Sequence, residues 1–303
     1  MAITRTSIIL LLRESKRMNF QGSILQLGRQ EVWTNKNELT LIAEKEKYAL
    51  CQNDETYNLK KSKFVDFMCM DDVSFFKMLG FSSVHSIDVD DFEAAEILWD
   101  LNLPITKELE GKKYDVIYDG GTLEHIFHLP NVLENLHKLL NVGGRIIHSS
   151  PVDMFNHGFY NFSPCLFEDF YSTNNYIINE CAIIKKRYDP VNKNFNGTAY
   201  YTDASRHSQF IRSLNLYTFD GAVHLLNFIA TKTVESTGNK VPIQGYYIDA
   251  FSPNKSIGND GLVSGNTPMK LIYAKLKLVP ILNIIVRYLR DAYARSLVNW
   301  ESI

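Results

Sequence analysis

Hydrophobic residues in the first half of the chain form short runs that alternate with helix-like segments. Residues 129–140 repeat Leu and Val at the spacing of a single apolar helix face, and an apolar run lies on either side of them. Because parallel strands need a crossover between them, this alternation predicts a parallel sheet covered by helices. We expect its strands at residues 22–28, 83–89, 95–102, 114–120 and 143–151.

The pattern becomes less regular in the second half of the chain. Residues 188–220 are rich in Asn, Asp and Tyr, which predicts an irregular insertion or lid. We expect one α/β domain over residues 1–248, followed by a linker and a helical extension over residues 249–303. Within the domain, a helix and two further strands are predicted at residues 164–175, 176–186 and 222–234.

Residues 270–297 carry apolar side chains on one helical face and mostly basic side chains on the other. Pro280 should kink this amphipathic helix or split it in two. The pattern allows two interpretations. The helix either packs on the domain or on a second subunit, or it lies on a membrane surface as a basic interfacial helix.

Composition narrows the class of protein further. Of the 303 residues, 45% are hydrophobic and 22% charged, and the net charge of −2 gives no reason to expect a nucleic-acid partner. The four cysteines include no C-x-x-C pair, which argues against a disulfide framework and fits a reducing compartment.

The apolar run at residues 8–12 is too short for a signal peptide or a bilayer span, and predicts a docked helix. We expect a cytoplasmic protein, with peripheral contact at the inner face of the membrane left open.

Glycines and acidic residues follow four of the predicted strands. In an open parallel sheet, ligands bind beyond the carboxyl ends of the strands. Gly28 would allow a close approach of the backbone to a ligand. Asp88 could accept hydrogen bonds from two ribose hydroxyls, and Asp100 could accept one from an adenine amino group. The order of these residues along the chain predicts a nucleoside-binding site, with Asp119-Gly120-Gly121 beside it.

The segment "YDVIYDGGTLEHIFHLPNVLENLHKLLNVGGRIIHSSP" (residues 114–151) resembles the fourth strand, following helix and fifth strand of class I S-adenosylmethionine-dependent methyltransferases. The resemblance extends over about residues 20–180. It implies a Rossmann-like methyltransferase fold with a doubly wound, mostly parallel seven-stranded sheet, and S-adenosylmethionine as cofactor. The next segment, "DMFNHGFYNFSPCLFEDFY", resembles methyltransferase-like proteins of bacterial surface-polysaccharide gene clusters. That narrower resemblance implies O-methylation of a sugar or glycan precursor.

The stretch "LQLGRQEVW" departs from the family's glycine-rich first motif, because it has one glycine where three are usual. Arg29 and Gln30 place bulky side chains where the cofactor is expected. Either the cofactor binds in an altered position, or the chain is a catalytically inactive scaffold that binds a partner of a glycan pathway. The resemblance implies cofactor contacts at Gly28, Arg29, Asp88, Asp100, Leu101, Asp119, Gly120 and Gly121.

Histidines near the predicted pocket are candidates for the general base that a sugar hydroxyl needs. His157 lies on a loop after the fifth strand and His125 begins the helix after the fourth. A plain turn role for His157 stays open, as does a helix-dipole role for Glu124. His125 and His128 are three residues apart, but no matched third ligand is evident, so no metal is expected. The acceptor is predicted to be a small molecule or glycan.

Overall fold

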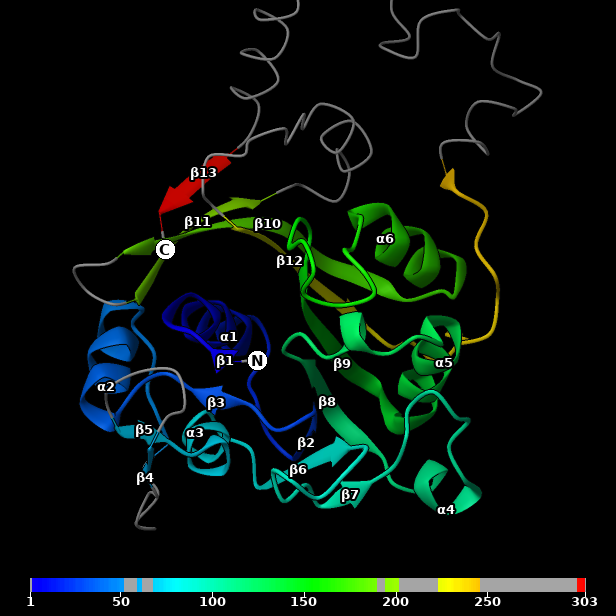
Figure 1. The fold of residues 1–303 in the computed structure, drawn as a ribbon, viewed down its shortest axis with the longest axis horizontal. Helices are drawn as coiled ribbons and strands as arrows, with labels where there is room; N and C mark the ends of the chain where they lie inside the picture. Colours follow the sequence, from blue (N-terminus) through cyan, green and yellow to red (C-terminus); the bar gives the residue numbers. More distant parts are fainter. Residues whose placement is uncertain are drawn as a thin grey trace, which may run out of the picture.

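The computed structural model describes most of the chain and shows an α/β protein (Figure 1). The described residues are 2–51, 59–61, 68–189, 194–201, 223–245 and 299–302.

Nine strands of the described chain form one sheet, in the order β13-β11-β10-β12-β9-β8-β2-β6-β7. The strands from β7 to β9 are parallel, and β12 is antiparallel to both of its neighbours, β9 and β10. The seven strands from β7 to β10 thus confirm the predicted doubly wound, mostly parallel sheet, and β11 and β13 extend it by antiparallel pairing. The bounds are Ser23–Leu27 (β2), Ser83–Asp88 (β6), Ile97–Leu98 (β7), Tyr114–Asp119 (β8), Leu140–Pro151 (β9), Ile177–Asp189 (β10), Asn194–Tyr201 (β11), Val223–Thr231 (β12) and Asn299–Ser302 (β13).

Helices cover both faces of this sheet (Figure 1). Successive residues of a strand point to opposite faces, so Ile24 packs in the core beneath α1, α2 and α3 while Leu25 packs in the core beneath α5 and α6. A small sheet of four short strands, in the order β1-β3-β5-β4, lies beside the first helical layer. The helices are Arg5–Arg17 (α1), Lys36–Lys45 (α2), Asp72–Met78 (α3), Lys107–Glu110 (α4), Leu123–His125 (η1, a 3-10 turn), Leu129–Leu139 (α5) and Pro164–Thr173 (α6), and the short strands are Ala2–Ile3 (β1), Glu31–Val32 (β3), Leu59–Lys61 (β4) and Met68–Met70 (β5).

The N-terminal helix α1 docks on the main sheet, as the apolar run at residues 8–12 predicts. All five residues of that run are buried. The buried Glu14 forms ion pairs with Arg145 of β9 and, at 3.2 Å, with Arg17. None of the described helices is long and apolar enough to span a bilayer.

Two predicted segments differ from the structure. The strand at residues 95–102 is reduced to the two residues of β7, because Asp100 and the residues after it turn away from the sheet. The irregular insertion predicted from residue 188 instead starts as a β-hairpin, in which Asp189 of β10 pairs with Asn194 of β11. Residues 202–220, the domain boundary near residue 248 and the amphipathic helix at 270–297 lie outside the described residues.

Candidate functional site

The strand order reverses between β2 and β8, which are neighbours in the middle of the sheet. From β2 the chain proceeds to β6 on one side, and from β8 it proceeds to β9 on the other. Open α/β sheets bind ligands outside the carboxyl ends of the strands at such a switch point. The loops after β2, β6 and β8 therefore define the candidate site, which we call the strand-end edge.

Gly28 adopts a backbone conformation at this edge that favours glycine, with φ +66°. A Cβ atom there would lie 3.1 Å from the Thr122 hydroxyl oxygen and 3.6 Å from Oδ2 of Asp88. Gly28 thus lets the loops after β2, β6 and β8 pack closely, because a side chain there would crowd Thr122. The close approach of a ligand to this backbone stays a prediction.

Asp119 ends β8 and organises the loop that follows it. Its side chain is completely buried. Oδ1 accepts hydrogen bonds from the backbone N–H groups of Gly121 at 3.2 Å, Thr122 at 2.8 Å and Leu123 at 3.3 Å. The carboxylate thereby holds the Gly120-Gly121 loop in place, and any contribution to a ligand would come through the loop that it shapes.

The second oxygen of Asp119 begins a buried chain of hydrogen bonds. Oδ2 lies 2.9 Å from Nδ1 of His148 and accepts a bond from the Ser150 hydroxyl at 3.3 Å. Because a carboxylate only accepts, Nδ1 donates, and Nε2 of His148 shares a hydrogen bond with the Tyr171 hydroxyl at 2.7 Å. Neither His148 nor Tyr171 is among the predicted site residues. The feature of the sequence that could have indicated His148 is a histidine inside the apolar run of β9.

The Arg29 side chain, expected to stand where a cofactor would lie, is held by contacts to α3 and to the loop after β6. Its Nε donates to Asp72 at 3.1 Å, and Nη1 donates to the Ala94 carbonyl at 2.8 Å. Nη2 lies 3.4 Å from a carboxylate oxygen of Glu96. These contacts connect Arg29 to α3 and to the loop after β6.

Gln30, in contrast, lies at the strand-end edge. Its amide packs on Gly120, where a Cβ atom would come 2.8 Å from Oε1 of Gln30. Nε2 donates to the Leu27 carbonyl at 3.3 Å. Oε1 is buried and has no hydrogen-bond partner in the described part of the chain, which leaves an acceptor beside the Gly120 backbone.

The remaining predicted cofactor residues lie at the ends of β6 and β7. Asp88 is partly buried, and its Oδ1 accepts from the Val89 N–H at 2.8 Å while Oδ2 faces Gly28. Asp100 caps a turn by accepting from both the backbone N–H and the side-chain amide of Asn102. The side chain of Leu101 is buried in the core, so only its backbone could touch a ligand.

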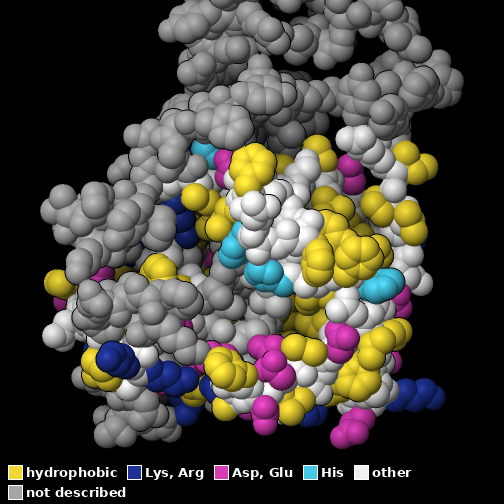
Figure 2. Space-filling model, in the orientation of Figure 1, with side chains coloured by type: hydrophobic (Ala, Val, Ile, Leu, Met, Phe, Trp, Pro, Cys, Tyr) yellow, Lys and Arg dark blue, Asp and Glu magenta, His cyan; other side chains and the backbone are white. Residues whose placement is uncertain are grey.

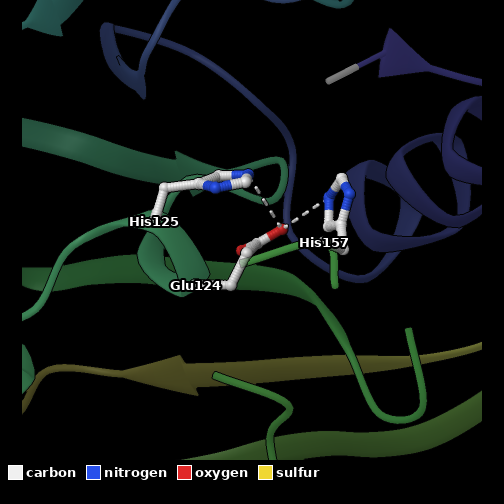
Figure 3. Close-up of side chains that lie close together, drawn as sticks. All are labelled: Glu124, His125 and His157. Carbon is white, nitrogen blue, oxygen red and sulfur yellow. Dashed lines mark ion pairs between the residues drawn. The ribbon is translucent and has the colours of Figure 1, made fainter. Parts of the chain in front are cut away.

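Glu124, His125 and His157 form a cluster (Figure 3). Each of these residues is singled out from the sequence, but their proximity is not predicted. Glu124 and His125 belong to η1, whereas His157 belongs to the loop after β9. Oε1 of Glu124 lies 3.6 Å from Nε2 of His157 and 4.0 Å from Nε2 of His125. The two imidazole rings meet edge to face with centroids 5.0 Å apart. His128, the other expected neighbour of His125, takes no part in this cluster.

The loop after β9 is fixed onto Glu124 by its backbone. The N–H groups of Phe159 and Tyr160 donate to the Glu124 carbonyl at 2.7 Å and 3.3 Å. Gly158 passes so close that a Cβ atom would lie 2.7 Å from the same carbonyl oxygen. The absence of a side chain at Gly158 therefore lets His157 reach the Glu124 carboxylate.

Burial sets the electrostatics of this cluster. Glu124 is completely buried, and neither carboxylate oxygen has a hydrogen-bond partner among the described residues. Desolvation, followed by the negative charge of Asp119, raises the pKa of Glu124 to about 8. Desolvation and then the neighbouring His157 lower the pKa of His125. The imidazoles are the solvent-facing part of the cluster, with side-chain exposures of 47% for His125 and 28% for His157.

Exposed aromatic side chains flank the cluster. Phe127 and Phe159 pack edge to face with ring centroids 5.6 Å apart. The Tyr160 hydroxyl donates to the Phe127 carbonyl at 2.7 Å and ties the two loops together. Figure 2 shows histidine side chains on this face of the molecule next to hydrophobic side chains. An acceptor that reaches the histidines would meet this aromatic surface.

Sequence comparisons find no matching family model and no similar curated protein. Solved structures that are similar to this chain include the following three. TehB from Haemophilus influenzae is 13% identical, with a TM-score of 0.35, and the match covers 74% of this chain but only 61% of TehB. The O-methyltransferase of a trans-AT PKS multienzyme from Brevibacillus brevis, in complex with S-adenosyl-L-homocysteine, is 13% identical over 78% of this chain and 74% of its own, with a TM-score of 0.38. A SAM-dependent methyltransferase from Archaeoglobus fulgidus is 12% identical over 76% of this chain and 95% of its own, with a TM-score of 0.38.

Proposed function

We propose that the chain is an S-adenosylmethionine-dependent methyltransferase that O-methylates a sugar or glycan precursor. One observation carries the proposal. The fold brings Gly28, Asp88 and the cluster of Glu124, His125 and His157 to the same strand-end edge. A nucleoside cofactor needs the first two groups, and an acceptor hydroxyl needs the third.

The residues at this edge fit the cofactor. Gly28 has no side chain that would block a cofactor, and Oδ2 of Asp88, 3.6 Å from the place of a Cβ atom there, is suited to ribose hydroxyls. Oε1 of Gln30 is an orphaned acceptor next to Gly120, suited to the charged amino group of the methionine part. When bound, S-adenosylmethionine supplies a methyl carbon activated by a positive sulfur.

The protein's own task is to hold the acceptor hydroxyl and remove its proton. We assign the removal of this proton to His157, whose Nε2 is buried without a hydrogen-bond partner among the described residues. Glu124 at 3.6 Å would stabilise the imidazolium that forms. His125, on the opposite side of the carboxylate, is the second candidate base (Figure 3). By aligning the hydroxyl with the methyl carbon, this cluster would lower the activation barrier. This effect of proximity reaches about 7–11 kcal/mol in favourable reactions.

Two observations support a sugar as the acceptor. Residues 153–171 resemble methyltransferase-like proteins of surface-polysaccharide clusters. The rings of Phe127 and Phe159 offer an apolar surface on which the C–H face of a sugar ring can stack beside the histidines. We place the activity in the cytoplasm, a reducing compartment that suits four cysteines without a disulfide bond.

A second candidate function follows from the position of Gln30. If its amide on Gly120 closes the site, the chain is a catalytically inactive scaffold, or a peripheral membrane partner, of a glycan pathway. Calorimetric titration with S-adenosylmethionine and S-adenosylhomocysteine separates the two. The methyltransferase proposal expects micromolar binding that Asp88→Ala abolishes and that Asp91→Ala, an exposed control on the next loop, preserves. Absence of binding up to millimolar concentrations, for both compounds and also in Gln30→Gly, would favour the scaffold.

A further inference from the structure

Glu124, His125 and His157 have the composition and spacing of a metal site. Each offers one ligand atom, a carboxylate oxygen or an imidazole nitrogen, and the three atoms lie within 4.8 Å of one another. Ligands around a tetrahedral zinc ion at about 2.0–2.1 Å stand roughly 3.4 Å apart. The distances of 3.6 Å and 4.0 Å from Oε1 of Glu124 to the two Nε2 atoms are therefore close to what an ion requires.

A second, independent observation points to a ligand at the same place. The Glu124 carboxylate is completely buried, and both of its oxygens lack a hydrogen-bond partner among the described residues. Nε2 of His157 is likewise buried and without a partner there. Buried polar groups are nearly always satisfied, so two such orphans that face each other indicate a missing partner. A cation would satisfy the carboxylate and accept the imidazole lone pairs at once.

We propose that Glu124, His125 and His157 bind a divalent transition-metal ion such as Zn²⁺, Co²⁺ or Fe²⁺. Two imidazoles favour these ions over Mg²⁺ and Ca²⁺, which prefer oxygen ligands. Because the His125 side chain is 47% exposed, water or an acceptor hydroxyl could reach a further position on the ion from that side, the arrangement of a catalytic rather than a structural site. The sequence alone does not predict this site because His157, on a distant loop, supplies the third ligand.

The metal site goes beyond the proposed methyltransferase function and does not depend on it. With an ion bound, the imidazoles are ligands and cannot act as bases. An acceptor hydroxyl in the open position would then become more acidic through the ion and release its proton to solvent. The metal-loaded and metal-free proteins would therefore differ in how the acceptor is deprotonated.

The test is calorimetric titration of the EDTA-stripped full chain with Zn²⁺, together with Co²⁺ titration followed by visible absorption. We expect one ion per chain and a Co²⁺ spectrum that Zn²⁺ removes. Glu124→Gln, His125→Ala and His157→Ala should each weaken binding at least about tenfold. His128→Ala is the matched control, an exposed histidine three residues from His125, and should bind as the wild type does.

Two outcomes would overturn the proposal. One is the absence of stoichiometric Zn²⁺ and Co²⁺ binding to the wild type. The other is binding that survives in Glu124→Gln and His157→Ala, whose folding is checked by circular dichroism. Titration with S-adenosylmethionine in EDTA reports on the cofactor site separately, so failure of the metal site and failure of the proposed function are distinguishable.

Discussion

Asp119 and Glu124 are two carboxylates only a few residues apart, and both are completely buried. Their surroundings are opposite. Asp119 accepts from three backbone N–H groups, from His148 and from a serine hydroxyl. The Glu124 carboxylate accepts a hydrogen bond from none of the described residues, and the imidazoles of His125 and His157 lie 4.0 Å and 3.6 Å from its Oε1.

Asp119 thus has a structural role, whereas Glu124 is the carboxylate that we propose as a ligand of a metal ion. A buried charge is tolerated when hydrogen bonds replace its hydration, as they do at Asp119. At Glu124 nothing in the described chain replaces it, so the folded protein is less stable than it would be with a neutral side chain there. Such a cost is typical of sites whose partner arrives from outside.

Removal of Asp119 should give the largest change in stability. Asp119→Ala leaves His148 and several buried N–H groups without their acceptor, so we expect the free energy of unfolding to fall by about 3–5 kcal/mol. Urea denaturation measures this. Asp100→Ala, which removes a carboxylate that caps a single turn, should lose only about 1 kcal/mol. Equal losses in the two variants would remove the structural role assigned to Asp119.

Lys186 is a third buried ionisable group. It has fewer hydrogen bonds than Asp119 but more than the Glu124 carboxylate, because its Nζ donates to the Thr4 hydroxyl at 3.0 Å. Burial lowers the pKa of Lys186 to about 8. Lys186→Met should therefore raise the free energy of unfolding at pH 7, by up to about 3 kcal/mol at 1.36 kcal/mol per pKa unit.

The pH dependence of the Lys186→Met effect distinguishes charge from packing. The folded protein disfavours the charged amine, so the cost is fully present below pH 8 and decreases as the pH rises from 8 towards the ordinary pKa of 10.5. The advantage of Met should shrink over that interval in denaturation curves. An advantage that stays constant with pH would assign the effect to packing instead.

The end of the Asp119 hydrogen-bond chain offers a smaller test. Tyr171→Phe removes only the hydroxyl that is hydrogen-bonded to His148, so the expected loss of stability is about 1–2 kcal/mol. Affinity for S-adenosylmethionine should not change, since Tyr171 is buried behind the strand-end edge. Loss of cofactor affinity without loss of stability would place Tyr171 in the binding site.

The fold was predictable where hydrophobic pattern alone decides structure. Strands β2, β6, β8 and β9 are apolar runs bounded by Gly or Asp, and the sequence places them within a few residues. The hairpin strand β11 was missed because its Asn- and Gly-containing sequence has no apolar alternation, and its pairing with β10 depends on backbone hydrogen bonds.

The candidate site was predictable only in part. His125 and His157 follow from the strand-end rule and the loop after β9, each as a separate candidate. Their meeting at Glu124 depends on the close passage of Gly158 and on backbone bonds to the Glu124 carbonyl, which no local pattern encodes. The turn of Arg29 towards Asp72 likewise depends on tertiary packing.

The most direct test of the contrast between Asp119 and Glu124 is the free energy of unfolding of the wild type and of Glu124→Gln from pH 4 to pH 9 in EDTA. Because the pKa of Glu124 is raised to about 8, the folded chain keeps a proton that the unfolded chain releases above its ordinary value of 4.5. The stability of the wild type should therefore fall relative to the Gln variant between these two pH values. We predict curves that nearly coincide near pH 4.5 and a Gln variant that is more stable by over about 1 kcal/mol at pH 8. A Gln variant that is less stable than the wild type at pH 8 would contradict the account, because it would make Glu124 a satisfied structural carboxylate like Asp119.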